Sequence, residues 1–257
     1  MTSELCARFA ASLAPLGFDL VQPCRVGWYN EAVRGDLRLE DWGSPRNLAL
    51  VVGNTRALWQ PFLVALAREP ALLEQSDPLD RYTEREVERA AQALGVPHAT
   101  RWAHDTGPGL VAMQRLGHVS GLAFLSASRL SVHPVFGPWV ALRAVLTFPL
   151  PGPDAPPVLQ HPCGDCSSHC LPAFERALRA SAQHHTVQAG EGSNAPQIPP
   201  AAAIEAEWRA WLACRDACPT GRDFRYVDPQ IEYHYTKKMS VLTACLPELL
   251  PVIEPLP

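Results

Sequence analysis

Hydrophobic positions along this chain follow two spacings, the four-residue recurrence of amphipathic helices and the unbroken apolar runs of buried strands. Leu5, Phe9 and Leu13 show the first spacing, and residues 48–52 show the second. Together the patterns predict helices over residues 3–15, 56–69, 77–94, 110–127, 171–183 and 201–214, and strands over residues 18–21, 48–52, 99–103 and 139–148. Strands interleaved with helices favour an α/β or α+β arrangement around one sheet.

Polar residues refine three of these segments. Asn54-Thr55 is expected to cap the helix at 56–69. The helix at 77–94 is charged on most faces, so it is expected to be exposed. Trp28, Tyr29 and Asn30 fall in a predicted loop, where the two aromatic rings either pack into the core or stack on a flat ligand.

Composition excludes several classes of function. The 257 residues include 22 Lys and Arg against 26 Asp and Glu, so no bulk charge favours nucleic acid or an anionic membrane. No apolar run approaches the ~20 residues of a membrane span. The first residues lack the basic and apolar regions of a signal peptide, which favours a cytoplasmic location. The eight cysteines are therefore expected to be thiols or metal ligands rather than disulfides.

Proline-rich segments divide the chain into three parts. Prolines gather at 149–162 and 196–200, which marks connectors. We expect a core over residues 1–150, an insert rich in Pro and Cys over 151–200, and a C-terminal part over 201–257 that completes the core and the ligand pocket. Within the insert, residues 185–200 are expected to form a mobile loop, and the tail after Leu246 is expected to fray.

Two polar residues stand out in the apolar stretch from Gln114 to Pro149. His118 lies among small residues of the predicted helix, and Arg143 interrupts the predicted strand at 139–148. Both are costly to bury without a partner. A core histidine and a structural arginine with local partners are one interpretation. Two residues of a ligand pocket are the other.

Five of the cysteines fall into two groups. Cys163-x2-Cys166 is followed by Cys170, and Cys214-x3-Cys218-Pro comes ~45 residues later. Thiolates at such spacings can hold one soft metal centre, which predicts an iron–sulfur cluster or zinc. The ferredoxin-type run is not intact, because an extra residue precedes Cys170. A set of reduced or redox-active thiols is the alternative interpretation.

A basic and aromatic group occupies the last third of the chain. Its arginines and tyrosines suit a large anionic ligand with a flat part, and surface salt bridges are the alternative. The group comprises Arg143, Arg209, Arg215, Arg222, Arg225, Tyr226, Tyr233 and Tyr235. The chain contains no nucleophile elbow, P-loop, zinc-protease or dinucleotide-binding motif, which disfavours a hydrolase.

In this order, the motifs resemble those of the cobalamin-processing proteins of the cblC type, the cyanocobalamin reductases and alkylcobalamin dealkylases. The similar segments are Gly17-Phe18, Trp28-Tyr29-Asn30, Asp77-Pro78-Leu79-Asp80, Gly117-His118-Val119-x-Gly121, His133-Pro134-x-Phe136-Gly137-x-Trp139-x-Ala141-x-Arg143, Trp208-Arg209-x-Trp211, Arg215-Asp216-Ala217 and Arg225-Tyr226-x3-Gln230-x2-Tyr233. The resemblance covers roughly residues 10–149 and 205–238.

The resemblance implies an α+β fold of the nitroreductase-like, flavin-reductase type, with helices flanking the sheet. It implies a protein that holds base-off cobalamin and removes its upper axial ligand, with FMN or glutathione as helper and a flavin, thiol or ferredoxin-like donor as reductant. The residues it assigns to the cofactor site are Trp28, Tyr29, Asn30, His118, Gly121, His133, Phe136, Trp139, Arg143, Arg209, Arg215, Tyr226, Gln230 and Tyr233. His118 would line the cobalt face.

The chain also departs from that family. The run after His118 is Phe124-Leu125-Ser126-Ala127, and the hairpin that follows is short. The cysteine groups instead resemble those of epoxyqueuosine reductases and reductive dehalogenases. They suggest an electron relay within the chain. A cobalamin carrier that hands its cargo to a partner, a flavin reductase without a corrin role, and a zinc-stabilised interaction protein are the competing hypotheses.

Overall fold

The computed structural model describes residues 2–158, 160–164, 166, 169–182 and 201–246. Its helices are α1 (Thr2–Leu13), α2 (Val26–Asn30), α3 (Trp59–Arg68), α4 (Pro70–Leu73), α5 (Pro78–Gln92), α6 (Met113–Val119), α7 (Leu171–Ala182), α8 (Ala201–Ala206), α9 (Trp208–Asp216), α10 (Asp228–Thr236) and α11 (Met239–Cys245). Its strands are β1 (Leu20–Arg25), β2 (Asn47–Asn54), β3 (Ala99–Trp102), β4 (Phe124–Leu125), β5 (Ser131–Val132) and β6 (Ala141–Pro151).

One antiparallel sheet with the strand order β1-β2-β6-β3 organises the fold. The predicted central strand at 48–52 is confirmed as β2, which is buried along almost its whole length. β1 contains Pro23, which cannot donate a backbone hydrogen bond, and β1 accordingly lies at an edge of the sheet. The α+β class is therefore confirmed.

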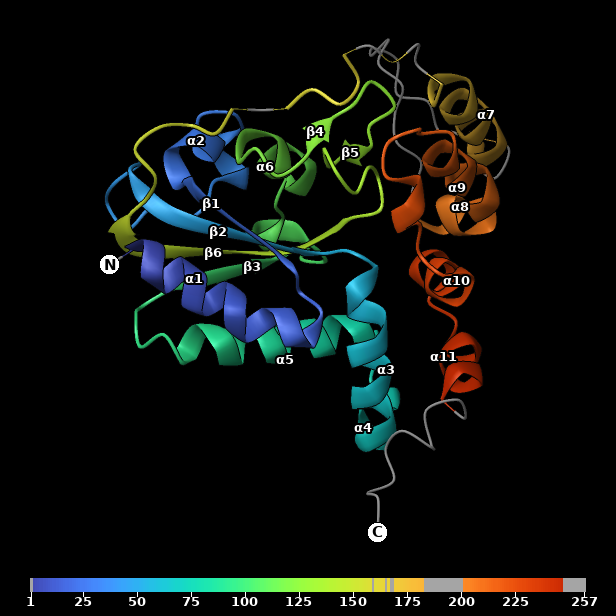
Figure 1. Ribbon diagram of the computed structural model, residues 1–257, viewed down its shortest axis with the longest axis horizontal. Coiled ribbons are helices and arrows are strands. Elements are labelled where there is room, and N and C mark those ends of the chain that lie inside the picture. Colours follow the sequence, from blue (N-terminus) through green and yellow to red (C-terminus); the bar gives the residue numbers. More distant parts are fainter. Residues whose placement is uncertain (1, 159, 165, 167–168, 183–200, 247–257) are drawn as a thin grey trace.

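Helices cover both faces of the sheet, as Figure 1 shows. α1, α3 and α5 pack on one face against residues such as Leu50 and Leu146. α2 and α6 pack on the other face against Val51 and Val145. Because side chains alternate along a strand, the continuous apolar runs of β2 and β6 supply both cores at once.

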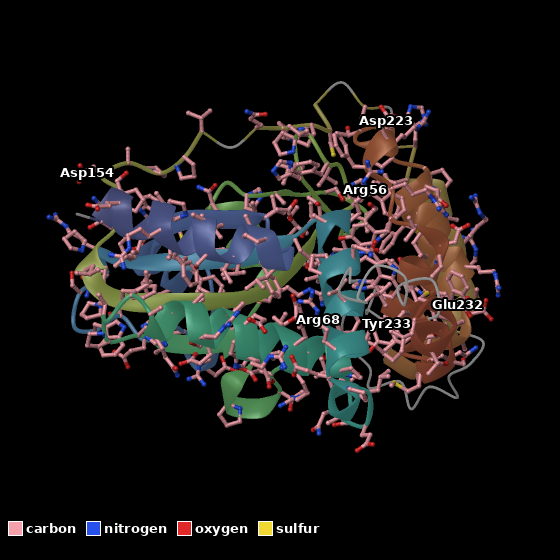
Figure 2. All side chains as sticks on the ribbon, turned by 60° about the horizontal axis from the view of Figure 1, so that its bottom comes forward. Arg56, Arg68, Asp154, Asp223, Glu232 and Tyr233 are labelled. Atoms are coloured by element: carbon pink, nitrogen blue, oxygen red, sulfur yellow. The ribbon has the colours of Figure 1, made fainter. Side chains whose placement is uncertain are left out.

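The helices after residue 170 gather at one end of the sheet (Figure 1). α7 packs against α9. α10 returns Tyr233 to the main core, where its ring lies 6.0 Å from the Trp59 ring. Figure 2 shows Tyr233 between the C-terminal helices and α3. The predictions for residues 185–200 and for the tail after Leu246 lie outside the described residues.

Four predictions about the elements are wrong. α5 is not exposed, because Leu79, Tyr82 and Val87 form an apolar stripe beneath its charged face. Trp28–Asn30 belongs to the short helix α2 rather than to a loop. The helix predicted over 110–127 ends at Val119, since Gly121 takes a left-handed backbone (φ 77°) before the β4–β5 hairpin. The helix predicted over 201–214 is two helices, α8 and α9.

No helix among the described residues combines the length and the apolar character needed to cross a membrane.

Candidate functional site

A cavity of about 210 Å³ lies where the start of β6 meets the C-terminal helices. α6, the β4–β5 hairpin and the start of β6 form its apolar walls, and α9 and α10 add one polar side chain each. Its lining residues are Met113, Gln114, Leu130, Ser131, Pro138, Val140, Ala141, Leu142, Arg215 and His234. Segments up to about 120 residues apart in sequence, from Met113 to His234, therefore line one cavity.

A β-bulge places Arg143 beside this cavity. Val52 pairs with Ala144, but Gly53 pairs with Leu142, so Arg143 has no partner in the register between β2 and β6. Such an extra residue bends a strand and changes where its side chains point. The Arg143 Nε–H donates to Asn54 Oδ1 at 2.7 Å, and the Asn54 Nδ2–H donates to the Thr55 carbonyl.

Arg143 is a buried cation without an ion pair among the described residues. Burial lowers the pKa of its guanidinium. The Tyr226 phenol and the Asp80 carboxylate act in the opposite direction, and Arg215 adds to the lowering. A buried positive charge with only a neutral amide as its hydrogen-bond partner attracts an anion into the adjacent space.

Arg215 is the arginine that lines the cavity. Its guanidinium lies 6.0 Å from the Trp139 ring and 5.7 Å from the Tyr235 ring. It forms no ion pair within the part of the chain that the structure describes. Arg225 differs, because it binds Asp216 at 2.9 Å and Asp228 at 2.7 Å. Of these two predicted arginines, Arg215 therefore keeps its charge available to a ligand.

His234 is a site residue that was not predicted from the sequence. It lines the cavity beside the rings of Tyr226 and Tyr235. Burial, followed by the charges of Arg215 and Arg143, holds its pKa well below the ordinary value, so the ring is neutral at pH 7. The available signal was helical spacing, because His234 lies four residues after the predicted Gln230 on α10.

Ser131 adds a polar group to the same cavity. Its hydroxyl oxygen is buried and has no hydrogen-bond partner among the described residues. Buried hydroxyls normally find a partner. The cavity lining thus combines a lone hydroxyl, a neutral imidazole and one arginine, Arg215, and Arg143 follows the lining residue Leu142. This donor set is expected for an anionic or hydrogen-bond-accepting group.

Trp139 and Tyr226 do not line the cavity, although the Trp139 ring contacts Arg215. Their rings are 5.7 Å apart, and the Tyr226 hydroxyl donates to the Asn54 carbonyl at 3.5 Å. Burial raises the pKa of Tyr226 to about 12. Tyr233 packs in the main core, and Gln230 is buried on α10, where its Oε1 has no hydrogen-bond partner among the described residues. Trp139 and Tyr226 thus pack behind Arg215 and help to hold it in place.

The predicted motif from His133 to Gly137 forms a tight turn. His133 Nδ1 accepts hydrogen bonds from the backbone N–H groups of Val135 and Phe136. Phe136 packs edge-on against Phe224, with the ring centres 4.8 Å apart. His133 and Phe136 thus hold the turn that leads into the cavity wall.

This turn is locked against a second turn, Cys218-Pro-Thr-Gly221. A Cβ on Gly137 would lie 1.9 Å from the Thr220 carbonyl oxygen, and a Cβ on Gly221 would lie 2.2 Å from the Phe136 carbonyl carbon. Both glycines also have positive φ angles, of 58° and 72°. Only glycine fits either position, so the contact fixes the C-terminal helices to the core.

His118 lies in the last turn of α6, and Gly121 follows that helix beneath the connector after β6. His118 Nδ1 accepts from the Leu125 N–H at 3.2 Å, and its ring contacts Phe124. A Cβ on Gly121 would lie 2.5 Å from Pro157, so the connector needs glycine there. Burial and the charge of Arg115 lower the pKa of His118. His118 is not among the residues that line the cavity.

Two residues of the predicted aromatic loop, Tyr29 and Asn30, use their polar groups to hydrogen-bond the backbone. The Tyr29 hydroxyl accepts from the Ala112 N–H at 2.9 Å. Asn30 exchanges two hydrogen bonds with the backbone of Leu39. Trp28 is half-buried beside Arg25 and keeps part of its ring exposed. Arg209 is also outside the cavity, since its exposed guanidinium stacks on Trp208 at 4.4 Å.

The five predicted metal-ligating cysteines lie in the connector before α7 or in and just after α9. Burial, followed by Cys218, Cys166 and Cys170, raises the pKa of Cys163, and burial, followed by Cys170, raises the pKa of Cys214 to about 11. All five are free thiols. However, the described residues contain no group of three or more His, Cys, Asp or Glu side chains arranged to hold a metal ion. Cys214 is buried against α7, and its thiol faces the Ala210 carbonyl of its own helix.

Comparison with known families decides the classification. The model of the methylmalonic aciduria and homocystinuria type C family matches residues 17–166, which is more than half of the chain. The chain belongs to this family. The match includes β1 to β6 and the arginine at the β-bulge, but it ends before α7. The matched residues therefore include most of the cavity lining, and Arg215 and His234 lie outside them.

Curated relatives carry the name cyanocobalamin reductase / alkylcobalamin dealkylase. The human protein of that name is 28% identical over 180 residues, and the mouse protein is 25% identical over 174 residues. The matched part spans 63% of this chain and 63% of the human protein, and 60% and 61% in the mouse comparison. The chain thus aligns with less than two thirds of either relative.

Solved structures confirm the nitroreductase-like fold. The C. elegans B12-trafficking protein CblC matches with a TM-score of 0.68 and 19% identity, covering 94% of this chain and 95% of that protein. An epoxyqueuosine reductase crystallised with a modified tRNA stem loop matches with a TM-score of 0.51 and 13% identity, covering 90% and 69%. The fold is therefore similar to both protein types that the sequence motifs resemble, the cblC-type proteins and the epoxyqueuosine reductases.

Proposed function

We propose that this protein binds cobalamin base-off and removes its upper axial ligand, by reductive decyanation or by dealkylation. The observation that carries the proposal is the family match over residues 17–166, since the relatives in that family are named for these two reactions. The cationic cavity at the end of the matched region supports it, because cobalamin carries a phosphate and many amide groups.

The cavity would take one polar arm of the ligand rather than the whole molecule. Its volume of about 210 Å³ lies below the ~300 Å³ at which pockets for drug-sized ligands begin. Arg143 and Arg215 suit a phosphate or carboxylate, either of the nucleotide tail or of glutathione. The corrin ring would lie over the surface between this cavity and His118.

His118 would then face the cobalt side without ligating the metal. Its Nδ1 accepts from the Leu125 backbone, so the neutral ring carries its proton on Nε2. A protonated Nε2 donates hydrogen bonds and offers no lone pair to cobalt. Trp28 would contribute its half-exposed ring. An unligated lower face favours reduction, and the protein's part is to position the ligand and exclude water.

The reductant is a second element of the proposal. Reduced FMN would suit decyanation, and the thiolate of glutathione would suit attack on an alkyl group. A cytoplasmic location would keep the eight thiols of this chain reduced. An iron–sulfur cluster or zinc at Cys163, Cys166, Cys170, Cys214 and Cys218 stays a prediction, which iron, sulfide and zinc analysis of anaerobically purified protein tests.

A visible-spectrum titration tests the function. Adding hydroxocobalamin, methylcobalamin or cyanocobalamin to the protein is expected to give the base-off shift, and adding reduced flavin or glutathione is expected to convert the bound form. Arg143→Met is expected to weaken binding at least tenfold. Arg34→Met is the matched control, because Arg34 is an exposed surface residue that pairs with Asp36.

The outcomes separate the competing functions. A base-off shift without conversion under any reductant would favour a carrier that hands cobalamin to a partner. A bound flavin without any shift would favour a flavin reductase. The absence of both would refute cobalamin processing.

A further inference from the structure

The His234 ring lines the cavity between two aromatic side chains. It belongs to the last turn of α10. The rings of Tyr226 and Tyr235 meet it edge-on, with centre-to-centre distances of 6.5 Å and 5.7 Å. Neither of its ring nitrogens has a hydrogen-bond partner within the part of the chain that the structure describes. An imidazole offers both a donor and an acceptor, so His234 keeps these groups available to whatever enters the cavity.

The charged groups around His234 are positive. They come from three elements, as Arg143 of β6, Arg215 of α9 and Lys237 at the end of α10. The other polar side chains of the cavity lining, Gln114 and Ser131, carry no charge. No carboxylate of the described residues forms an ion pair with His234 or with Arg215. The cavity therefore has an excess of positive charge and no anion of its own.

The position of His234 in its helix favours a positive charge on the ring. α10 ends at Thr236, two residues later, and the unpaired carbonyl groups of a last helical turn attract cations. Burial and the neighbouring cations oppose that charge and hold the pKa of His234 well below its ordinary value. The empty cavity thus holds a neutral imidazole next to an unpaired arginine.

An anion in the cavity would reverse this balance. Its negative charge would pair with Arg215 and offset the positive charge that disfavours a proton on His234. The protonated ring could then donate a hydrogen bond from each nitrogen, whereas the neutral ring donates only one. A hydrogen bond between a charged donor and a charged acceptor is also stronger than a neutral one. Binding of an anion and protonation of His234 therefore favour each other.

We propose that His234 selects an anionic group for this cavity: it hydrogen-bonds the carboxylate or phosphate that enters and takes up a proton from solvent as that group binds. The inference deepens the proposed function and rests on it for the source of the anion. Cobalamin offers the phosphate of its nucleotide tail, and glutathione offers its carboxylates. An uncharged group of the same size gains nothing from the protonation, so it is bound less tightly.

Proton uptake makes ligand affinity depend on pH. The loaded protein holds a proton that the empty protein does not, so affinity rises as the pH falls. We expect a gain of about tenfold between pH 7.5 and pH 5.5, since one proton changes an affinity by at most about tenfold per pH unit. A site built from Arg215 and uncharged groups alone would show no such dependence, because arginine stays charged over this range.

Calorimetric titration of the full chain measures the proton uptake. Binding is followed at pH 6 in MES and in bis-Tris, two buffers that differ in ionisation enthalpy. The ligands are cyanocobalamin, glutathione and cobinamide, which lacks the nucleotide tail. Uptake with cyanocobalamin but not with cobinamide assigns the anion to the phosphate, and uptake with glutathione assigns it to a carboxylate.

A histidine variant removes the proton acceptor. His234→Gln keeps an N–H donor but cannot be protonated, so it should lose both the proton uptake and the pH dependence of affinity. Uptake that persists in this variant comes from the nucleotide base released from cobalt and is subtracted. His98→Gln is the matched control, because His98 pairs with Glu88 on α5. It should take up protons as the unaltered protein does.

The outcomes separate the inference from the proposed function. If the unaltered protein and His234→Gln take up equal amounts of protons with every ligand that binds, the inference is refuted, while a base-off shift with conversion leaves the function standing. If neither corrin binds, the function is refuted, and uptake with glutathione would still support the role of His234. Should His234→Gln not fold, NMR of histidine-labelled protein decides: no ring that becomes protonated on adding ligand would overturn the inference.

Discussion

The two parts of this molecule use their polar residues differently. In the family-matched core, Tyr29, Asn30 and His133 all direct their polar atoms to nearby backbone groups. In the C-terminal helices, Arg215 and His234 direct theirs into a cavity. The first set holds the shape of the scaffold, and the second set keeps its chemistry available to a ligand.

This difference locates function at the junction of the two parts. The core supplies Ala141 and Leu142, which precede the β-bulge at Arg143, whereas α9 and α10 supply Arg215 and His234. Neither part has a complete site by itself. The contact between Gly137 and Gly221 is therefore as important to the site as any residue that lines it.

Breaking that contact is expected to have the largest effect. Gly137→Ala would force a Cβ to within 1.9 Å of the Thr220 carbonyl oxygen at a positive φ. We expect a loss of at least about 3 kcal/mol in the free energy of unfolding, measured by denaturant titration. Gly43→Ala is the control, because it has a positive φ but open space, and should lose only about 1–2 kcal/mol. Equal losses would contradict the locked junction.

Two arginines of one helix sharpen the comparison further. Arg215→Met should weaken cobalamin binding about tenfold, equivalent to about 1.4 kcal/mol. Arg209→Met should change it less than twofold, because Arg209 is exposed and stacks on Trp208 away from the cavity. Spectral titration of both variants measures the two affinities. A larger effect at Arg209 would mean that the ligand extends over the outer face of α9.

The neutral His234 predicts how stability depends on pH. Its pKa is depressed in the folded protein, so below the ordinary value of 6.5 the unfolded chain binds a proton that the folded chain does not. Stability should therefore fall as the pH falls below 6.5, by up to about 1.4 kcal/mol per pH unit for this group. His118 and His133 contribute in the same direction.

A His234→Gln variant isolates that contribution. Its free energy of unfolding between pH 7.5 and pH 5 should fall less steeply than that of the unaltered protein, while the slopes above pH 7 should agree. Identical curves would place the His234 ring in contact with solvent.

The smallest expected effect tests the core side of the comparison. Tyr29→Phe removes the acceptor of the Ala112 N–H and should cost about 1 kcal/mol in the free energy of unfolding. Cobalamin affinity should stay within threefold. If the variant lost more free energy of cobalamin binding than free energy of unfolding, Tyr29 would have to be a ligand-site residue.

The sequence itself determined most of the scaffold. The apolar runs that become β2 and β6 predict central strands, because a strand covered on both faces tolerates few polar residues. The order of motifs from Gly17 to Arg143 predicted the family and the nitroreductase-like fold. The exposure of α5 was predicted wrongly, because its many charged residues outnumber the apolar residues that recur every three to four positions along its buried face.

Only the tertiary structure decided which polar residues remain available. Tyr29 and Arg215 look equally suited to a ligand in the sequence, yet the Tyr29 hydroxyl contacts a backbone amide and Arg215 lines a cavity. His234 became part of the site because α10 returns to the core after some 90 residues. Long-range packing sets burial and the partners of each polar atom, and local sequence patterns do not contain that information.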